Sequence, residues 1–172
     1  MKILVTAFKP FNKQSINHSS EVIKYINNVD KIILDVCYDE CYTELTNHYN
    51  LDEYDLIIAL GEARMRKELT VEKYAKNIAS CSLPDNNNIL YKDHKIIENE
   101  KEILTTNLNL DLISDFISIS FDAGKFVCNN LYFHLLHNYP NKSLFIHIPD
   151  CKSIDDYKTH AAKIEQIINI LK

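Results

Sequence analysis

The feature that most constrains this chain is a series of short, continuous apolar runs separated by segments with helical periodicity. The runs occupy residues 2–8 (KILVTAF), 31–36 (KIILDV), 54–61 (YDLIIALG), 117–121 (ISISF) and 143–149 (SLFIHIP). A strand that is apolar on both faces is typical of a parallel sheet covered by helices on both sides. The pattern therefore predicts an α/β fold, a three-layer α/β/α sandwich around a central, mostly parallel twisted sheet.

The segments between the runs complete this prediction. Residues 19–28 (SSEVIKYINN) suggest a helix with a serine cap, and residues 39–49 and 127–139 suggest two more. The last helix is the clearest, because Ser153 and Asp156 form a capping box ahead of a strongly periodic apolar stretch. Residues 67–77 alternate as an edge or excursion strand would, and residues 83–97 indicate a turn and a short hairpin. Without a linker or repeat, residues 1–172 are predicted to form a single domain.

Charge and composition exclude several classes of protein. The chain carries 19 basic and 24 acidic residues, a net charge of −5, and no basic block. This argues against nucleic acid and against an anionic membrane surface as partners. The N-terminal apolar run is too short for a signal peptide, and no run approaches a membrane span, so we expect a cytoplasmic protein.

The five cysteines are an odd number without a regular framework, so we expect free thiols. The spacing of Cys37 and Cys41 is a poor zinc signal because no second pair follows it. Ordinary packing is the expectation for this pair, and we predict no metal site.

Cys128 stands where the chain should turn from a strand into a helix. The strand 117–121 precedes Gly124, which permits a tight or left-handed turn, and a helix is expected to start near Phe126 or Val127. A thiol in a first helical turn feels the positive end of the helix dipole, which lowers its pKa, and unpaired N–H groups there can stabilise an oxyanion. The alternative is a buried cysteine that only packs.

A nucleophilic cysteine needs a base and a group that orients the base. Among seven histidines, His147 is distinctive because it ends a buried strand at the sheet edge where Cys128 should emerge. His134 and His137 lie one turn apart on one helix and are interpreted as core or surface residues. Glu72 is a charged residue within an apolar alternation; it either orients His147 or is simply exposed on an edge strand.

Four blocks in order carry a resemblance to a known family. They are TAFKPF (6–11), EKYAKN with the later LPDN (72–77 and 83–86), DAGKFVCN (122–129) and FIHIP (145–149). Together they resemble the pattern of the pyroglutamyl peptidase (pyrrolidone-carboxylate peptidase) family, whose members are cysteine peptidases with an α/β/α sandwich fold. The resemblance implies removal of N-terminal pyroglutamate, with Cys128 as nucleophile, His147 as general base and then acid, and Glu72 as its orienting partner.

The same resemblance implies a substrate, a pocket and an assembly. The substrate is a small peptide with a blocked N-terminus, and no metal or organic cofactor is expected. The family forms tetramers, so a homo-oligomer, a dimer or a tetramer, is possible here. A pocket for the neutral lactam ring is expected to be lined by Phe8, Phe11, Asn17, Glu62, Phe126 and Val127. Core packing at a strand end is the alternative for the first two.

Several positions depart from the family pattern. Ala7, Asn12 and Lys13 stand where glycines are usual, Glu62 where a glutamine or an apolar residue is common, and Ser82 where an arginine is often found. Lys125 adds positive charge three residues before Cys128. These departures leave two alternative functions open: a thiol hydrolase with the same triad acting on another small N-terminal acyl or cyclic amide group, and a catalytically degenerate binding module.

Overall fold

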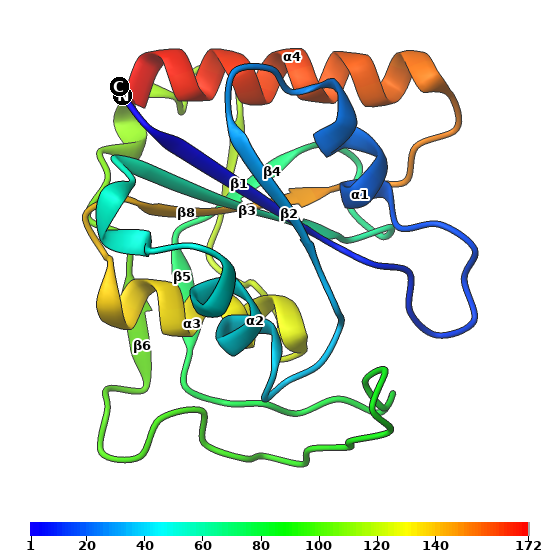
Figure 1. Ribbon diagram of the computed structural model, residues 1–172, viewed down its shortest axis with the longest axis vertical. Coiled ribbons are helices and arrows are strands. Elements are labelled where there is room, and N and C mark those ends of the chain that lie inside the picture. Colours follow the sequence, from blue (N-terminus) through cyan, green and yellow to red (C-terminus); the bar gives the residue numbers. More distant parts are fainter. Residues whose placement is uncertain (172) are drawn as a thin grey trace.

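A six-stranded sheet forms the middle layer of the protein (Figure 1), whose structure, a computed structural model, describes residues 1–171. Its strands lie in the order β2-β1-β3-β8-β4-β7, and only the β8–β4 pair is antiparallel. The strands are β1 (Ile3–Phe8), β2 (Asp30–Leu34), β3 (Leu56–Glu62), β4 (Thr70–Glu72), β7 (Ser118–Ser120) and β8 (Ser143–Ile148). The predicted mostly parallel sheet is confirmed. The run at 31–36 was expected to be a buried strand, but β2 is a largely exposed strand at the edge of the sheet.

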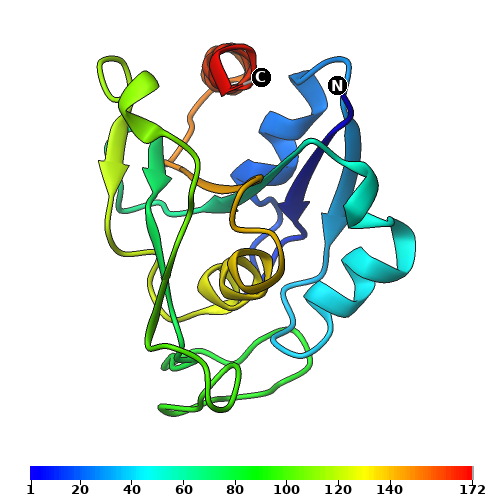
Figure 2. The ribbon, with the colours of Figure 1, turned by 90° about the vertical axis from the view of Figure 1, so that its left-hand side faces the viewer.

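Helices cover both faces of this sheet, as the continuous apolar strands predict. Figure 1 shows one layer above the sheet and one below it, and Figure 2 shows the lower helix α3 nearly end-on. The upper layer holds α1 (His18–Val22), its short 3₁₀ continuation η1 (Ile23–Tyr25) and α4 (Ile154–Leu171); the lower holds α2 (Cys41–His48) and α3 (Val127–Asn138). Two further 3₁₀ turns are η2 (Leu51–Glu53) and η3 (Leu110–Leu112).

The helix caps differ in part from expectation. The box at the start of α4 forms as predicted: Asp156 N donates to Ser153 Oγ at 3.2 Å, and Ser153 N donates to Asp156 Oδ2 at 3.0 Å. The serine cap predicted for the first helix is wrong. Asn17 caps α1 instead, because its Oδ1 accepts from Ser19 N at 3.0 Å, and asparagine is at least as good a cap as serine.

Three local predictions in the middle of the chain need correction. Residues 117–121 were expected to form a buried strand, but β7 is a half-buried edge strand, and Phe121 beyond it is exposed. Part of the stretch 67–77 is not an edge: β4 lies between β8 and β7. Residues 83–97 form no hairpin; the small second sheet pairs β5 (Tyr74–Lys76) with β6 (Ile103–Thr105) across a long loop.

The carboxyl ends of the parallel strands β1, β3 and β8 lie on the same side of the sheet. Helix α3 starts at the same edge, after a turn in which Gly124 adopts φ +80°. That conformation strains any residue with a Cβ, which explains the glycine. No helix in residues 1–171 combines the length and apolar character that crossing a membrane requires.

Candidate active site

Pairing of β3 with β8 sets His147 beside Gly61 at the edge where the parallel strands end. Along β8, Phe145 packs into the core beneath the sheet and Ile146 into the core above it. Because side chains alternate along a strand, His147 points to the same face as Phe145, toward α3. The imidazole therefore faces the helix that carries Cys128.

Glu72 holds one nitrogen of this imidazole. Strand β4 runs antiparallel to β8, with Glu72 opposite Phe145, so the carboxylate reaches the same face of the sheet. His147 Nδ1 lies 2.7 Å from Glu72 Oε1, and Glu72 is 0% exposed. A buried carboxylate in this position orients the ring and leaves Nε2 as the reactive nitrogen. The exposed-edge interpretation of Glu72 is wrong.

Two further residues secure Glu72. Arg66 donates from its guanidinium to Glu72 Oε1 and to the Asp122 carbonyl, both at 2.8 Å. Tyr132 on α3 donates its hydroxyl to the Glu72 carbonyl at 2.8 Å. The arginine compensates the buried charge, and the tyrosine fixes the strand against the helix that bears the thiol.

Cys128 lies in the first turn of α3, as the sequence predicts. The first intrahelical hydrogen bond runs from Asn130 N to Phe126 O, so the backbone N–H groups of Val127 and Cys128 precede the helical ladder. A Cβ built on Gly61 would lie only 2.7 Å from Cys128 Sγ. Glycine is thus required at the end of β3 for the thiol to approach the strand beside His147.

The resting thiol differs from the expectation of a lowered pKa. Burial raises the pKa of Cys128 to about 12, and the carboxylates of Glu72 and Glu62 add to the effect. Desolvation and nearby negative charge thus outweigh the one helix terminus, whose field alone predicts the opposite direction. Cys128 is therefore a neutral thiol at pH 7 unless a base removes its proton.

A small cavity of about 30 Å³ opens in front of the thiol. Its volume suits a water or two, so a five-membered ring requires side chains to move apart. Phe11 and Phe126 contact each other across it with ring centroids 5.7 Å apart. The cavity is lined by Phe8, Phe11, Asn17, Val36, Glu62, Phe126, Val127 and Cys128, a set that holds every residue of the sequence-predicted ring pocket and adds Val36.

The polar groups of this cavity are already engaged. Asn17 Oδ1 accepts from Ser19 N and Ser19 Oγ, and its amide donates to the Lys9 carbonyl at 3.1 Å. Glu62 Oε2 accepts from His18 N at 2.7 Å, and Glu62 Oε1 accepts from Arg64 Nε at 2.7 Å. Asn17 thus serves the α1 cap, whereas the carboxylate of Glu62 has lone pairs to spare for a ring N–H.

The residues that depart from the family pattern lie in different environments in the structure. Asn12 and Lys13 adopt φ +50° and +60°, so the loop keeps the left-handed backbone that glycine favours. Ala7 is buried within β1. Ser82 and Lys125 are exposed.

Other motif residues fix the long loop below α3. Asn129 accepts from Lys76 N and donates to the carbonyls of Lys76 and Ile78, at 2.8 to 3.0 Å. Asn77 accepts from two backbone N–H groups near residue 96 and donates to two carbonyls. Asp85 accepts from Tyr38 N at 2.9 Å. These asparagines and this aspartate belong to the motifs named in the sequence analysis, which did not predict that they hold the loop.

Sequence reasoning missed four residues of the site: Gly61, Val36, Arg66 and Tyr132. Gly61 carried a usable signal, because it is one of only two glycines in the chain and stands at the end of a predicted strand. Val36 and Tyr132 carried none, since an apolar residue after a strand and a tyrosine in a helix are ordinary core residues. No group of three or more histidine, cysteine, aspartate or glutamate side chains in residues 1–171 is arranged to hold a metal ion.

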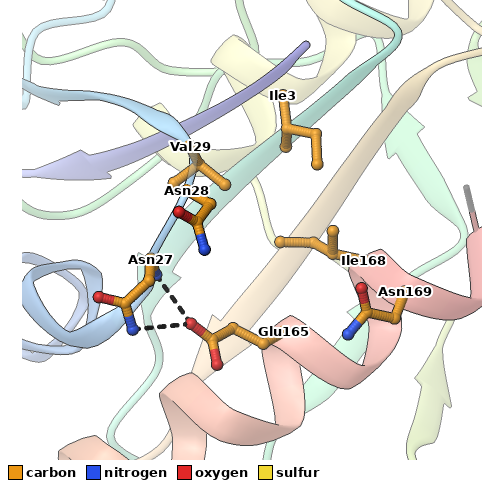
Figure 3. Close-up of a pocket in the computed structure, with 7 residues that line it drawn as sticks. All are labelled: Ile3, Asn27, Asn28, Val29, Glu165, Ile168 and Asn169. Carbon is orange, nitrogen blue, oxygen red and sulfur yellow. Dashed lines mark hydrogen bonds between the residues drawn. The ribbon is translucent and has the colours of Figure 1, made fainter. Parts of the chain in front are cut away.

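A larger cavity, of about 250 Å³, lies at the opposite end of the strands (Figure 3). It separates the last turns of α4 from the turn before β2, and Asn27 donates to Glu165 Oε1 across its rim at 2.8 and 3.1 Å. Its lining holds no thiol or imidazole and none of the predicted site residues. Size alone therefore does not locate the chemistry in this protein.

Comparison with known proteins identifies the family of this chain. A sequence model described as pyroglutamyl peptidase matches residues 1–171. Pyrrolidone-carboxylate peptidases of Enterococcus faecalis and Thermosipho africanus are 30% and 32% identical to the chain over 167 residues, which is 87% of this chain and 78% and 82% of those proteins.

Solved structures give the same result. The pyrrolidone carboxyl peptidase of Thermococcus litoralis superposes with a TM-score of 0.83 at 27% identity, over 99% of this chain and 92% of that one. The enzyme of Thermus thermophilus has the same fold, with a TM-score of 0.88 at 20% identity, over 98% of this chain and 100% of that one. The chain belongs to the pyroglutamyl peptidase family of cysteine peptidases.

Proposed function

We propose that this protein removes N-terminal pyroglutamate from peptides through an acyl-enzyme on Cys128. The observation that carries the proposal is the buried pair of Glu72 and His147, with Oε1 and Nδ1 2.7 Å apart. His147 lies opposite Gly61 in the β3–β8 pair, and Cys128 Sγ approaches that same glycine. A nucleophile, a base and a group that orients the base are the parts that thiol acyl transfer needs. The names of the relatives supply the substrate class.

The first step is activation of the thiol by His147. Glu72 accepts from Nδ1–H, so Nε2 carries the lone pair that takes the Cys128 proton. The sulfur then attacks the carbonyl carbon that joins pyroglutamate to the next residue, and the carbonyl oxygen becomes an oxyanion. The N–H groups of Val127 and Cys128 precede the helical ladder and stabilise this charge.

The second half returns the enzyme to its resting state. His147 gives its proton to the leaving amine as the C–N bond breaks, which leaves a thioester on Cys128. Water, deprotonated by His147, attacks the thioester and releases free pyroglutamate and the thiol. Side chains and water carry every step, and we propose no metal or organic cofactor.

The residues that line the ring pocket have the chemistry to hold a small neutral lactam. Phe8, Phe11 and Phe126 provide apolar faces, Val127 closes the wall beside the thiol, and Glu62 accepts the ring N–H. Because the cavity holds only about 30 Å³ when empty, binding requires movement of the half-buried Phe11 or Phe126. Asn17 supports the wall as the cap of α1.

The remaining attributes stay predictions. These are a small peptide with a blocked N-terminus as the substrate, no nucleic acid or membrane as a partner, a homo-oligomer (a dimer or a tetramer) of this chain, a cytoplasmic location, and one domain over residues 1–172.

Release of aminomethylcoumarin from its pyroglutamyl conjugate, by wild type and by Cys128→Ser at equal concentration, tests the proposal. Turnover by wild type alone is the expected result. No turnover, with Cys128 still labelled rapidly by iodoacetamide, would favour the second candidate, a same-triad hydrolase of another small acyl or cyclic amide group, which the small cavity and Glu62 motivate. No turnover and a Cys128 no more reactive than Cys81 would indicate a degenerate binding module.

A further inference from the structure

Glu62 is the one ionisable residue besides Cys128 among the described residues that line the cavity. Its side chain is only 3% exposed, so its negative charge has lost most of its hydration. An unpaired carboxylate in such a place attracts a cation from any ligand that reaches it. What the pocket selects therefore depends on how that charge is balanced.

Arg64 supplies the balance from outside the cavity. Its Nε donates to Glu62 Oε1 at 2.7 Å and one terminal nitrogen lies 3.4 Å from Oε2, while the Arg64 side chain is 39% exposed. The Nε2 of the neighbouring His18 is 3.9 Å from Glu62 Oε2 but lies within hydrogen-bonding distance of Asp150 Oδ1, at 3.1 Å, so its polar contact is with another carboxylate. Arg64 is thus the principal counter-charge of Glu62.

The same guanidinium also contacts the loop that follows β1. It lies 3.1 Å from Gln14 Oε1 and 3.4 Å from the Ile16 carbonyl, both in the loop that carries Phe11. Arg64 therefore connects the end of β3 to the loop after β1. Any test must separate its effect on charge from its effect on this loop.

The charge of Glu62 determines which of two similar N-terminal rings the pocket prefers. Pyroglutamate and N-terminal proline share a five-membered ring with nitrogen in the same place. The first presents a neutral N–H and a carbonyl, and the second a protonated secondary amine. A carboxylate that is paired with arginine accepts the neutral N–H, whereas an unpaired one favours the cation.

We propose that Arg64 is a specificity-determining residue, which neutralises Glu62 so that the pocket takes a neutral lactam in preference to the protonated ring of N-terminal proline. This rests on the proposed function. Arg64 touches neither the thiol nor His147, so its effect is on the choice of ring rather than on acyl transfer.

The test compares kcat/KM for pyroglutamyl- and prolyl-aminomethylcoumarin. In Arg64→Met we expect the pyroglutamyl-to-prolyl ratio to fall by about tenfold or more, the scale of one lost ion pair in a partly buried site. Arg64→Lys keeps the charge and should retain most of the ratio. The double variant Glu62→Gln/Arg64→Met removes both charges and should restore it. Lys67→Met, at another exposed cation of the same loop, should leave it unchanged.

A second readout does not depend on turnover: protection of Cys128 from iodoacetamide by 2-pyrrolidone or by pyrrolidinium at pH 8. Wild type should be protected by the lactam, and Arg64→Met by the cation. If wild type hydrolyses neither conjugate but protection shifts in this way, the inference stands and the proposed function fails. If wild type hydrolyses the pyroglutamyl conjugate and Arg64→Met lowers both activities equally, Arg64 only holds the Phe11 loop and the inference is overturned.

Discussion

At the scale of single residues, the site depends on the absence of one Cβ. A Cβ on Gly61 would lie 2.7 Å from both Cys128 Sγ and Phe145 Cζ, closer than van der Waals contact allows. Phe145 is fully buried and cannot move away. The thiol must therefore shift, and with it the line of attack on the carbonyl.

We expect Gly61→Ala to lower kcat for the pyroglutamyl conjugate at least about tenfold and to destabilise the protein by about 1–3 kcal/mol, the usual cost of overpacking. Gly124→Ala is the matched comparison. Its φ of +80° disfavours alanine by about 1 kcal/mol, yet nothing lies within 4 Å of the new Cβ. Urea unfolding and steady-state kinetics measure both effects; equal kcat in the two variants would contradict the steric argument.

The pKa of the thiol predicts how much Cys128 depends on His147. With a pKa of about 12, an unassisted Cys128 is only about 10⁻⁴ ionised at pH 8, and this fraction rises tenfold per pH unit. In His147→Ala we expect labelling of Cys128 by iodoacetamide at pH 8 to fall at least about tenfold below wild type and to recover only as the pH approaches 11. Peptide mass spectrometry resolves Cys128, with Cys81 in the same digest as internal control. Equal rates in both proteins at pH 8 would show that His147 does not activate the thiol.

At the scale of elements, α3 does more than carry the nucleophile. Asn129, the next residue after Cys128, makes three hydrogen bonds to the chain around β5 and is completely buried. Through these bonds the first turn of α3 holds the start of the long loop between β5 and β6. The nucleophile and the loop are therefore coupled by adjacent residues of one helix.

Asn129→Ala should lower the free energy of unfolding by about 2–4 kcal/mol, because it leaves the partly buried N–H of Lys76 and carbonyl of Ile78 without these partners. It should also speed proteolytic nicking within residues 80–101. Asn138→Ala, at an exposed asparagine in the last turn of α3, is the control and should change stability by less than about 0.5 kcal/mol. Equal stability of the two variants would exclude the proposed link between helix and loop.

The same elements show what the sequence could and could not predict. The apolar runs that form β1, β3 and β8 and the α4 capping box carry strong local signals, and their predictions are confirmed. The runs at 31–36 and 117–121 look the same in the sequence but form edge strands that are not fully buried. The position of β4 depends on pairing with β8 and β7, which are distant in sequence, so alternation alone placed it wrongly at an edge. The loop at 83–97 resembled a hairpin because asparagines and aspartates favour turns, whereas its backbone is held by side chains such as Asp85 and Asn77.

At the scale of the whole molecule, electrostatics combines contributions that no motif reveals. The order of Cys128, His147 and Glu72 along the chain was readable from the family pattern, but the raised pKa of the thiol was not. It results from burial of the thiol and from carboxylates on β3 and β4, and these come together only in the fold. Likewise, the sequence does not show that Glu62 is buried at the end of β3 beside α1, and this burial gives its pairing with Arg64 its importance.

Burial of several thiols predicts the alkaline behaviour of the whole protein. Desolvation raises the pKa of Cys37 to about 11 and those of Cys128 and Cys151 to about 12, and it raises that of Cys41 as well. In the unfolded chain these thiols ionise near about 8.5. Above that pH the unfolded state releases protons that the native state keeps, so the free energy of unfolding falls as pH rises, by up to about 1.4 kcal/mol per pH unit for each thiol.

Urea unfolding under reducing conditions should therefore show full stability up to about pH 8 and a decline that begins at about pH 8.5, the pKa of the unfolded thiols, and continues up to their native pKa values of about 11 to about 12. Cys41→Ala tests the cause at a site away from the catalytic cavity, in the core between α2 and α3. It lowers stability at every pH through the lost packing, but its decline with pH should be shallower by up to one proton. A free energy of unfolding that stays level from pH 8 to 10, or an unchanged slope in Cys41→Ala, would mean that the buried thiols ionise as readily in the native protein as in the unfolded chain.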